Sequence, residues 1–79
     1  MNNRNFGTFV RKQLNDIDRS NEWLYRRTGI GTGAVNRWCD GQEPTLSNSI
    51  NVFVYLANQK QTTLLRMTEM YYIYLGLIR

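Results

Sequence analysis

Residues 20–38 read SNEWLYRRTGIGTGAVNRW, and this stretch decides the fold. Ser20 is a favourable N-cap, because its side chain can accept a hydrogen bond from the first turn of a helix. Gly29 can adopt the left-handed conformation that commonly ends a helix. A further short helix follows directly, with Thr32 or Gly31 as its expected cap. The stretch therefore predicts two short helices joined by a tight glycine turn.

Apolar residues outside this stretch also recur at helical spacing. A first helix is predicted by Phe6, Val10, Leu14 and Ile17, which fall on one helical face. Pro44 forbids continuation of the third helix, and a fourth is expected from Thr45 up to a loop over residues 58–61. Its expected buried face consists of Leu46, Ile50, Phe53 and Leu56. Residues 62–79 are predicted as a fifth helix rather than a strand, since strand alternation would leave both faces apolar.

Five helices and no strand make an all-α fold. We expect one domain over residues 1–79, a compact five-helix bundle with a polar arm (1–5), a core (6–58) and a C-terminal helix (62–79). A chain of 79 residues buries only a small core. Association with a second chain would compensate for this.

Composition narrows the function classes. The net charge is +4, and seven of the ten Lys and Arg residues lie in residues 1–37, which indicates an anionic partner or else a solvated basic surface. With no histidine and one cysteine, neither a Cys/His zinc site nor an internal disulfide is expected, and we expect no metal, no cofactor and no enzymatic activity. The longest apolar run is far below the roughly 18–20 residues that span a bilayer, and the start lacks the apolar core of a signal peptide. We therefore expect a cytoplasmic protein.

The motif of residues 20–44 resembles the Cro/repressor-type (XRE-like) helix-turn-helix family of phage and bacterial regulators. The resemblance covers about residues 6–57. It rests on the Leu24, Gly29 and Ile30 pattern, on Val35, and on the Gly41-x-x-Pro44 closure. Leu24, Ile30 and Val35 are the expected apolar contacts that lock the two helices together. The chain departs from the family at Tyr25, where a small residue is usual, at Gly31, where a serine or threonine cap is usual, and at Ser49, where an apolar residue is common.

The resemblance implies a sequence-specific transcriptional regulator and not an enzyme. The expected protein is a Cro-like repressor of a bacterial host, encoded by the host, a phage or a prophage. Its partner would be a double-stranded DNA operator. The outward residues of the third helix are the candidate base contacts: Thr32, Gly33, Asn36 and Arg37. The alternative for Arg37 is solvation or pairing with Asp40. The candidate phosphate contacts are Asn21, Arg11, Lys12, Arg26, Arg27, Gln42 and Arg4.

The C-terminal helix is apolar around most of its circumference, which indicates a partner surface. We expect a homodimer whose two recognition helices read an inverted repeat. The residues expected to form the dimer contact are Leu65, Met67, Met70, Tyr71, Tyr72, Tyr74, Leu75 and Ile78. One alternative is an antitoxin-type autoregulator whose apolar segment binds another protein. Others are an adaptor without DNA binding and a helix buried wholly in its own domain. No ligand-sensing domain is expected after the motif, so control would come from concentration or competition.

Two further residue types have a structural and a functional interpretation. Trp23 and Trp38 suit base stacking, but packing in or around the small core is the favoured prediction. Cys39 is expected to be a half-buried small apolar residue rather than a redox sensor.

Overall fold

The computed structural model describes residues 4–78, which form five α-helices and no strand. The helices are α1 (Phe6–Asp16), α2 (Asn21–Thr28), α3 (Ala34–Cys39), α4 (Leu46–Gln59) and α5 (Leu64–Leu75). The all-α prediction is confirmed, including the helical assignment of the fifth segment. Residues 1–3 of the expected arm and Arg79 of the expected last helix lie outside the described residues.

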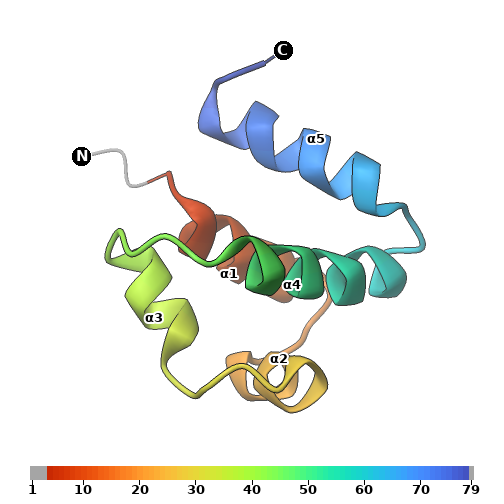
Figure 1. Cartoon of the computed structure of the whole chain (residues 1–79). Coiled ribbons are helices and arrows are strands. Elements are labelled where there is room, and N and C mark those ends of the chain that lie inside the picture. The colour runs from red at the N-terminus through yellow and green to blue at the C-terminus, as the bar shows by residue number, and fades with distance from the viewer. Residues whose placement is uncertain (1–3, 79) are drawn as a thin grey trace.

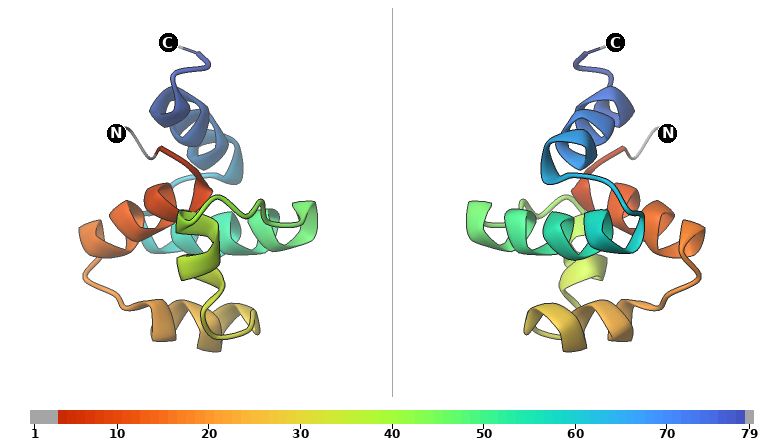
Figure 2. Two further views of the ribbon diagram at one scale, coloured as in Figure 1. Left: turned by 90° about the vertical axis from the view of Figure 1, so that its left-hand side faces the viewer. Right: turned by 90° about the vertical axis from the view of Figure 1, so that its right-hand side faces the viewer.

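The helices are arranged in three levels (Figure 1). α1 and α4 lie in the middle, α5 crosses above them, and α2 lies below. α5 packs on α4 and α1, α2 packs on α4, and α3 packs on α1. In the two side views of Figure 2, α5 and α2 again occupy opposite ends of the molecule. The α2–α3 unit and the C-terminal helix therefore present separate surfaces.

Local signals set most of the helix ends. The Ser20 side chain accepts the Trp23 N–H at 3.1 Å, and Thr45 caps α4 in the same way through the Asn48 N–H. Gly29 ends α2 with φ 74°. Asn5 begins α1 as a capping box with Thr8 and also donates to the Cys39 carbonyl at 2.8 Å. This end of the expected arm is therefore tied to the fold.

The predicted start of α3 is wrong. α3 begins at Ala34 after Gly33, whose φ is 85°, so neither Gly31 nor Thr32 is its N-cap. Gly33 has no side chain with which to cap the helix. Instead the Val35 N–H donates to the Tyr25 hydroxyl at 3.1 Å. A side chain of α2 therefore supplies the hydrogen-bond acceptor for an N–H group in the first turn of α3.

One apolar cluster holds all five helices together. Phe6 contacts Phe53 and Trp38, with ring centroids 5.3 Å and 4.9 Å away, and so joins α1 to α4 and α3. The buried residues are Phe6, Phe9, Val10, Leu14, Leu24, Ala34, Val35, Trp38, Val52, Phe53, Leu56, Ala57 and Met67. Truncation of any of these side chains to alanine would weaken the packing of more than one helix.

The predicted buried face of α4 is half wrong. Phe53 and Leu56 are buried, but Leu46 is 77% exposed and Ile50 is 43% exposed. The residues that complete the buried face are Val52 and Ala57. The early turns of α4 are uncovered because α5 leaves an open groove beside them, which both residues line. α4 also continues two residues into the expected loop, to Gln59.

Gly7 sets the distance between α1 and α3. A Cβ at this position would lie 2.1 Å from the backbone nitrogen of Cys39 and 2.5 Å from the carbonyl carbon of Trp38. The α3 backbone therefore rests directly on α1, an approach that only glycine permits. This contact fixes where the exposed side of α3 points.

Candidate nucleic-acid interface

The α2–turn–α3 unit is locked from the inside by the predicted apolar contacts. Leu24 and Val35 are fully buried, and Ile30 packs partly buried against the core. The amide of Asn51 on α4 donates to the Thr28 carbonyl at 3.0 Å, which ties the last turn of α2 to the body. The angle between α2 and α3 is therefore fixed by packing, by the Tyr25 hydroxyl and by this bond.

The outer side of α3 carries the predicted base-reading side chains. Asn36 and Arg37 are exposed, as is Thr32 before the helix, while Gly33 is half-buried. A Cβ at Gly33 would lie 3.4 Å from the Arg37 Nη1 atom. The guanidinium of Arg37 thus lies back over the start of α3, where the glycine leaves room for it.

Arg37 makes no ion pair with any residue in 4–78, Asp40 included. Asp40 is the C-cap of α3 and is exposed. The five guanidinium donors of Arg37 are therefore available to a partner, in a planar arrangement that suits guanine or a phosphate.

Arg11 of α1 joins the α3 side chains. Its Nη2 atom donates to the Asn36 Oδ1 atom at 3.1 Å, across 25 positions of sequence. This bond leaves the amide N–H groups of Asn36 pointing away from Arg11, since one amide presents its acceptor and its donors on opposite sides. Arg11, Asn36 and Arg37 form one exposed polar cluster, which we call the α3 cluster.

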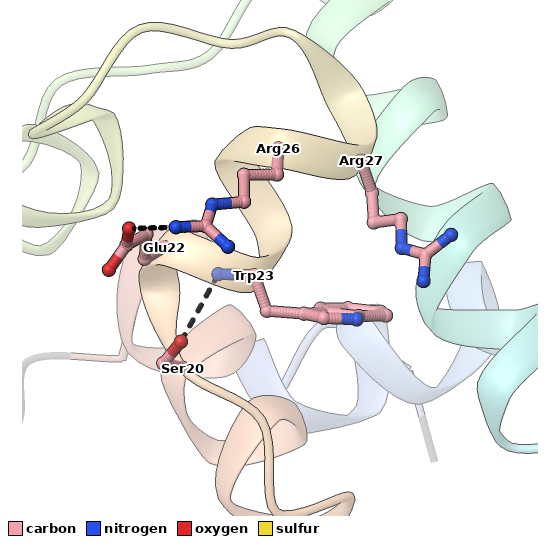
Figure 3. Close-up of a pocket in the computed structure, with 5 residues that line it drawn as sticks. All are labelled: Ser20, Glu22, Trp23, Arg26 and Arg27. Atoms are coloured by element: carbon pink, nitrogen blue, oxygen red, sulfur yellow. Dashed lines mark hydrogen bonds and ion pairs between the residues drawn. The ribbon is translucent and has the colours of Figure 1, made fainter.

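A second group of cations lies along α2, with Arg26 and Arg27 in its last turn (Figure 3). A surface pocket of about 410 Å³ is lined by Ser20, Glu22, Trp23, Arg26 and Arg27. Arg26 is turned toward Glu22, with Nη2 and Oε1 2.6 Å apart, so part of its charge is neutralised. Arg27 lies over the Trp23 ring at 5.8 Å.

Arg19 completes this group, although the sequence reasoning did not select it as a contact. Its guanidinium lies 5.4 Å from the centroid of the Trp23 ring. Its position directly before the Ser20 cap was the available signal, because anions bind where helix N–H groups are free. Asn21, the first residue of α2, is half-buried at the same helix end.

The remaining predicted phosphate contacts are Lys12, Gln42 and Arg4, and each has a different environment. Lys12 is exposed and lies 3.8 Å from Asp16. Gln42 is exposed after α3, and its backbone N–H donates to the Arg37 carbonyl. Arg4 lies 5.6 Å from the Tyr74 ring and donates to the Tyr74 carbonyl at 3.3 Å, so it is held on α5.

Some of the predicted dimerisation residues are exposed, and others are packed inside the monomer. Met67 is fully buried in the monomer, so its assignment to a dimer surface is wrong. It fills the space between α5 and the core. Met70, Tyr71 and Tyr74 pack against the core, and Leu75 is half-buried. Leu65, Tyr72 and Ile78 are exposed, Leu65 at 72%.

The exposed apolar surface extends onto α4, which the sequence reasoning missed. Leu46, Ile50, Leu64 and Tyr72 line a groove of about 200 Å³ over Phe53 and Tyr71. We call these four residues the α4–α5 surface. Among the residues that the structure describes, no charged side chain lines this groove. An uncharged apolar surface of this kind suits a protein partner.

The tryptophans and the cysteine have structural environments. Trp38 is buried, and Trp23 is partly buried against the core, which confirms the packing prediction. Cys39 is half-buried, as predicted. Burial raises the pKa of its thiol, an effect that Arg11 partly opposes and Asp40 adds to. Burial likewise raises the pKa of Tyr71, with Glu43 contributing.

Within residues 4–78, no group of three or more His, Cys, Asp and Glu side chains is placed to hold a metal ion. None of the helices in this range combines the length and the apolar character that crossing a bilayer requires. Comparisons with protein-family models, with curated proteins and with solved structures find no match for this chain.

Proposed function

We propose that this protein is a sequence-specific double-stranded DNA-binding regulator, with α2 and α3 as a Cro/repressor-type helix-turn-helix. The observation that carries the proposal is the α3 cluster: the exposed guanidinium of Arg37, which has no ion pair within residues 4–78, and the exposed Asn36 amide bonded to Arg11, beside a short helix held to α2 by buried contacts. An α-helix with such an outer side fits the major groove.

The proposal gives the side chains two roles. Arg37 and Asn36 read base edges, because a guanidinium pairs with guanine and an amide with adenine. Thr32 offers a hydroxyl and a methyl group beside them, and Gly33 permits close approach. Arg27, Arg19 and the start of α2 bind phosphates, which fixes the register on the duplex.

A homodimer formed through the α4–α5 surface and the exposed part of α5 would complete the regulator. α5 and α2 lie at opposite ends of the molecule, with α3 extending from the level of α1 toward α2, so two copies could associate through α5 without covering the α3 cluster (Figure 2). A two-fold pair would place its recognition helices about 34 Å apart on an inverted repeat. In this scheme the protein represses transcription by occupying its operator.

The test is binding to DNA fragments from around the gene, beside a scrambled duplex, at several salt concentrations. We expect site-selective binding, with log affinity falling by about 0.9 per log unit of salt for each phosphate engaged. Arg37→Gln should reduce the free energy of binding to the operator by about 1–3 kcal/mol and relax specificity at one base pair. Arg27→Gln should weaken binding to all duplexes alike and reduce the slope of log affinity against log salt by about 1.

Arg66→Gln is the matched control, because it removes the same charge from the exposed side of α5. Equal loss in Arg37→Gln and Arg66→Gln would mean that only net charge matters. No measurable affinity at low salt would overturn the proposal and favour a protein adaptor.

The exposed α4–α5 surface also favours the second candidate, an antitoxin-type autoregulator that binds another protein there. Sedimentation of the purified chain separates the two. A dimer that dissociates on substitution of the α4–α5 surface supports self-association. A monomer that still binds operator DNA, and that forms a stoichiometric complex with a protein encoded beside it, supports the antitoxin.

A further inference from the structure

A second groove beside α5 differs in chemistry from the α4–α5 surface. It lies between α1 and α5 and has a volume of about 300 Å³. Four residues supply an apolar or aromatic floor: Phe9, Met70, Ile73 and Tyr74. Three supply polar groups: Lys12, Gln13 and Arg66. We call this groove the α1–α5 pocket. An apolar floor with a few convergent polar groups is the usual composition of a small-molecule site.

Gln13 carries the argument, because it is polar and only 2% exposed. Its Oε1 atom accepts a hydrogen bond from the Lys60 ammonium, which also donates to Asp16 at 3.2 Å. An ammonium has donors only, so this bond fixes which way the amide is turned. The Nε2 group of Gln13 must face away from Lys60.

That Nε2 group has no acceptor among residues 4–78. In this range the indole N–H of Trp23 is the one fully buried side-chain polar atom without a partner, so Nε2 of Gln13 keeps a small exposed area, and Gln13 lines the pocket. A donor held this way inside a mostly apolar groove favours a ligand with an acceptor atom.

The charges around the pocket define that acceptor. Arg66 is exposed and makes no ion pair within the described residues. Lys12 shares its charge only loosely with Asp16, at 3.8 Å. No carboxylate of residues 4–78 lines the pocket. Two cations and an N–H donor favour an anionic oxygen group, and hydrogen bonds to such groups are stronger than neutral ones.

We propose that the α1–α5 pocket binds a small amphiphilic carboxylate, a molecule with one carboxylate and an aliphatic or aromatic body. The carboxylate accepts from the Gln13 amide and lies between Lys12 and Arg66. The body covers Phe9, Met70 and Ile73. A free phosphate would leave the apolar floor uncovered, and a neutral hydrocarbon would leave the amide donor unpaired. A second copy of the chain fits less well, since it would bring further cations to the same place.

This site goes beyond DNA recognition and does not depend on it. The pocket is formed by α1 and α5, whereas the α3 cluster lies on α3 and the adjoining side of α1. Failure of either proposal therefore leaves the other intact, provided that ligand binding is measured without DNA.

The experiment is titration of the intact protein with octanoate, followed by two-dimensional ¹⁵N NMR of backbone and side-chain amides. We expect saturable binding of one octanoate per chain, with the largest shifts in the Gln13 side-chain amide and in the backbone of Phe9 and Met70. Octanol tests the body without the charge, and acetate tests the charge without the body. Both should bind at least about tenfold more weakly, since a hydrogen bond to a charged group is worth about that factor.

The variant for the test is Lys12→Gln combined with Arg66→Gln. Both side chains are exposed, so the fold should persist, and a circular dichroism spectrum checks this. Octanoate affinity should fall about tenfold. Arg19→Gln, between α1 and α2 and not among the residues that line the pocket, should leave the octanoate affinity unchanged. The proposal is overturned if octanol binds as tightly as octanoate, if the double variant retains full affinity, or if the Gln13 amide signal does not move.

Discussion

Substitution of Gly7 by alanine tests the contact that positions α3. The added Cβ would lie 2.1 Å from the Cys39 nitrogen and 2.7 Å from the Cys39 Cα. Heavy atoms in favourable contact are about 3.5–4.0 Å apart. The obstacle is backbone, which cannot rotate aside as a flexible side chain would. α1 and α3 must therefore separate by more than about 1 Å for the clash to be relieved.

Two opposing terms set the size of the effect. Alanine in place of a helical glycine gains roughly 0.5–1 kcal/mol from reduced backbone entropy in the unfolded chain. Overpacking costs about 1–3 kcal/mol and occasionally more. The upper end applies here because moving α3 also moves Trp38, which is 3% exposed and in edge contact with Phe6. We expect a net loss of about 2 kcal/mol, or a fall in Tm of about 8–16 °C.

Urea denaturation followed by circular dichroism measures this loss, with Gly31→Ala as the matched control. A Cβ at Gly31 meets nothing within 4 Å, so that variant should be neutral or gain up to about 1 kcal/mol. The reasoning is refuted if Gly7→Ala unfolds at the wild-type urea concentration, or if the Gly31→Ala variant loses as much. If DNA binding is established, Gly7→Ala should weaken it at temperatures where the protein remains folded.

Three further predictions concern single side chains. Tyr25→Phe removes the acceptor of the Val35 N–H and should cost about 1 kcal/mol in urea denaturation, as loss of a helix cap does; an unchanged unfolding midpoint would show that water replaces the hydroxyl. Leu46→Lys should convert a dimer to a monomer in sedimentation while changing monomer stability by less than about 0.5 kcal/mol, because this side chain is 77% exposed; unaltered sedimentation of a dimer would place its interface elsewhere. Because burial raises the pKa of the Cys39 thiol, less thiolate is present at a given pH, so alkylation by iodoacetamide should reach half its maximal rate at a higher pH than for free cysteine. A lower midpoint would contradict this environment for Cys39.

Features that depend on neighbouring residues could be predicted from the sequence. The Ser20 and Thr45 caps act over three residues, and Gly29 ends α2 through its own backbone conformation. Helical spacing likewise identified Phe6, Val10 and Leu14 as one buried face. Each of these signals is contained within one or two turns of chain, so no tertiary information was needed.

Features that depend on distant residues could not be predicted in this way. Arg4 and Tyr74 are 70 positions apart, and Arg11 and Asn36 are 25 apart. The exposure of Leu46 depends on where α5 crosses α4, which helical spacing does not specify. Met67 was assigned to an outer surface for the same reason: a helix that is apolar on most sides does not reveal which side faces the core.

Tyr25 illustrates how two local irregularities can have one tertiary cause. Taken separately, a large residue at the crossing of α2 and α3 and a glycine at the start of α3 both weaken the case for a well-defined helix pair. In the structure the Tyr25 ring reaches the first turn of α3, and its hydroxyl accepts the Val35 N–H that Gly33 cannot cap. Gly33 in turn leaves space into which the Arg37 guanidinium folds. A serine at position 33 would restore a side-chain cap only by forcing a left-handed conformation on a residue with a Cβ and by crowding Arg37. The tyrosine therefore supplies the cap from α2, and the glycine keeps the start of α3 open for the side chain proposed to read DNA.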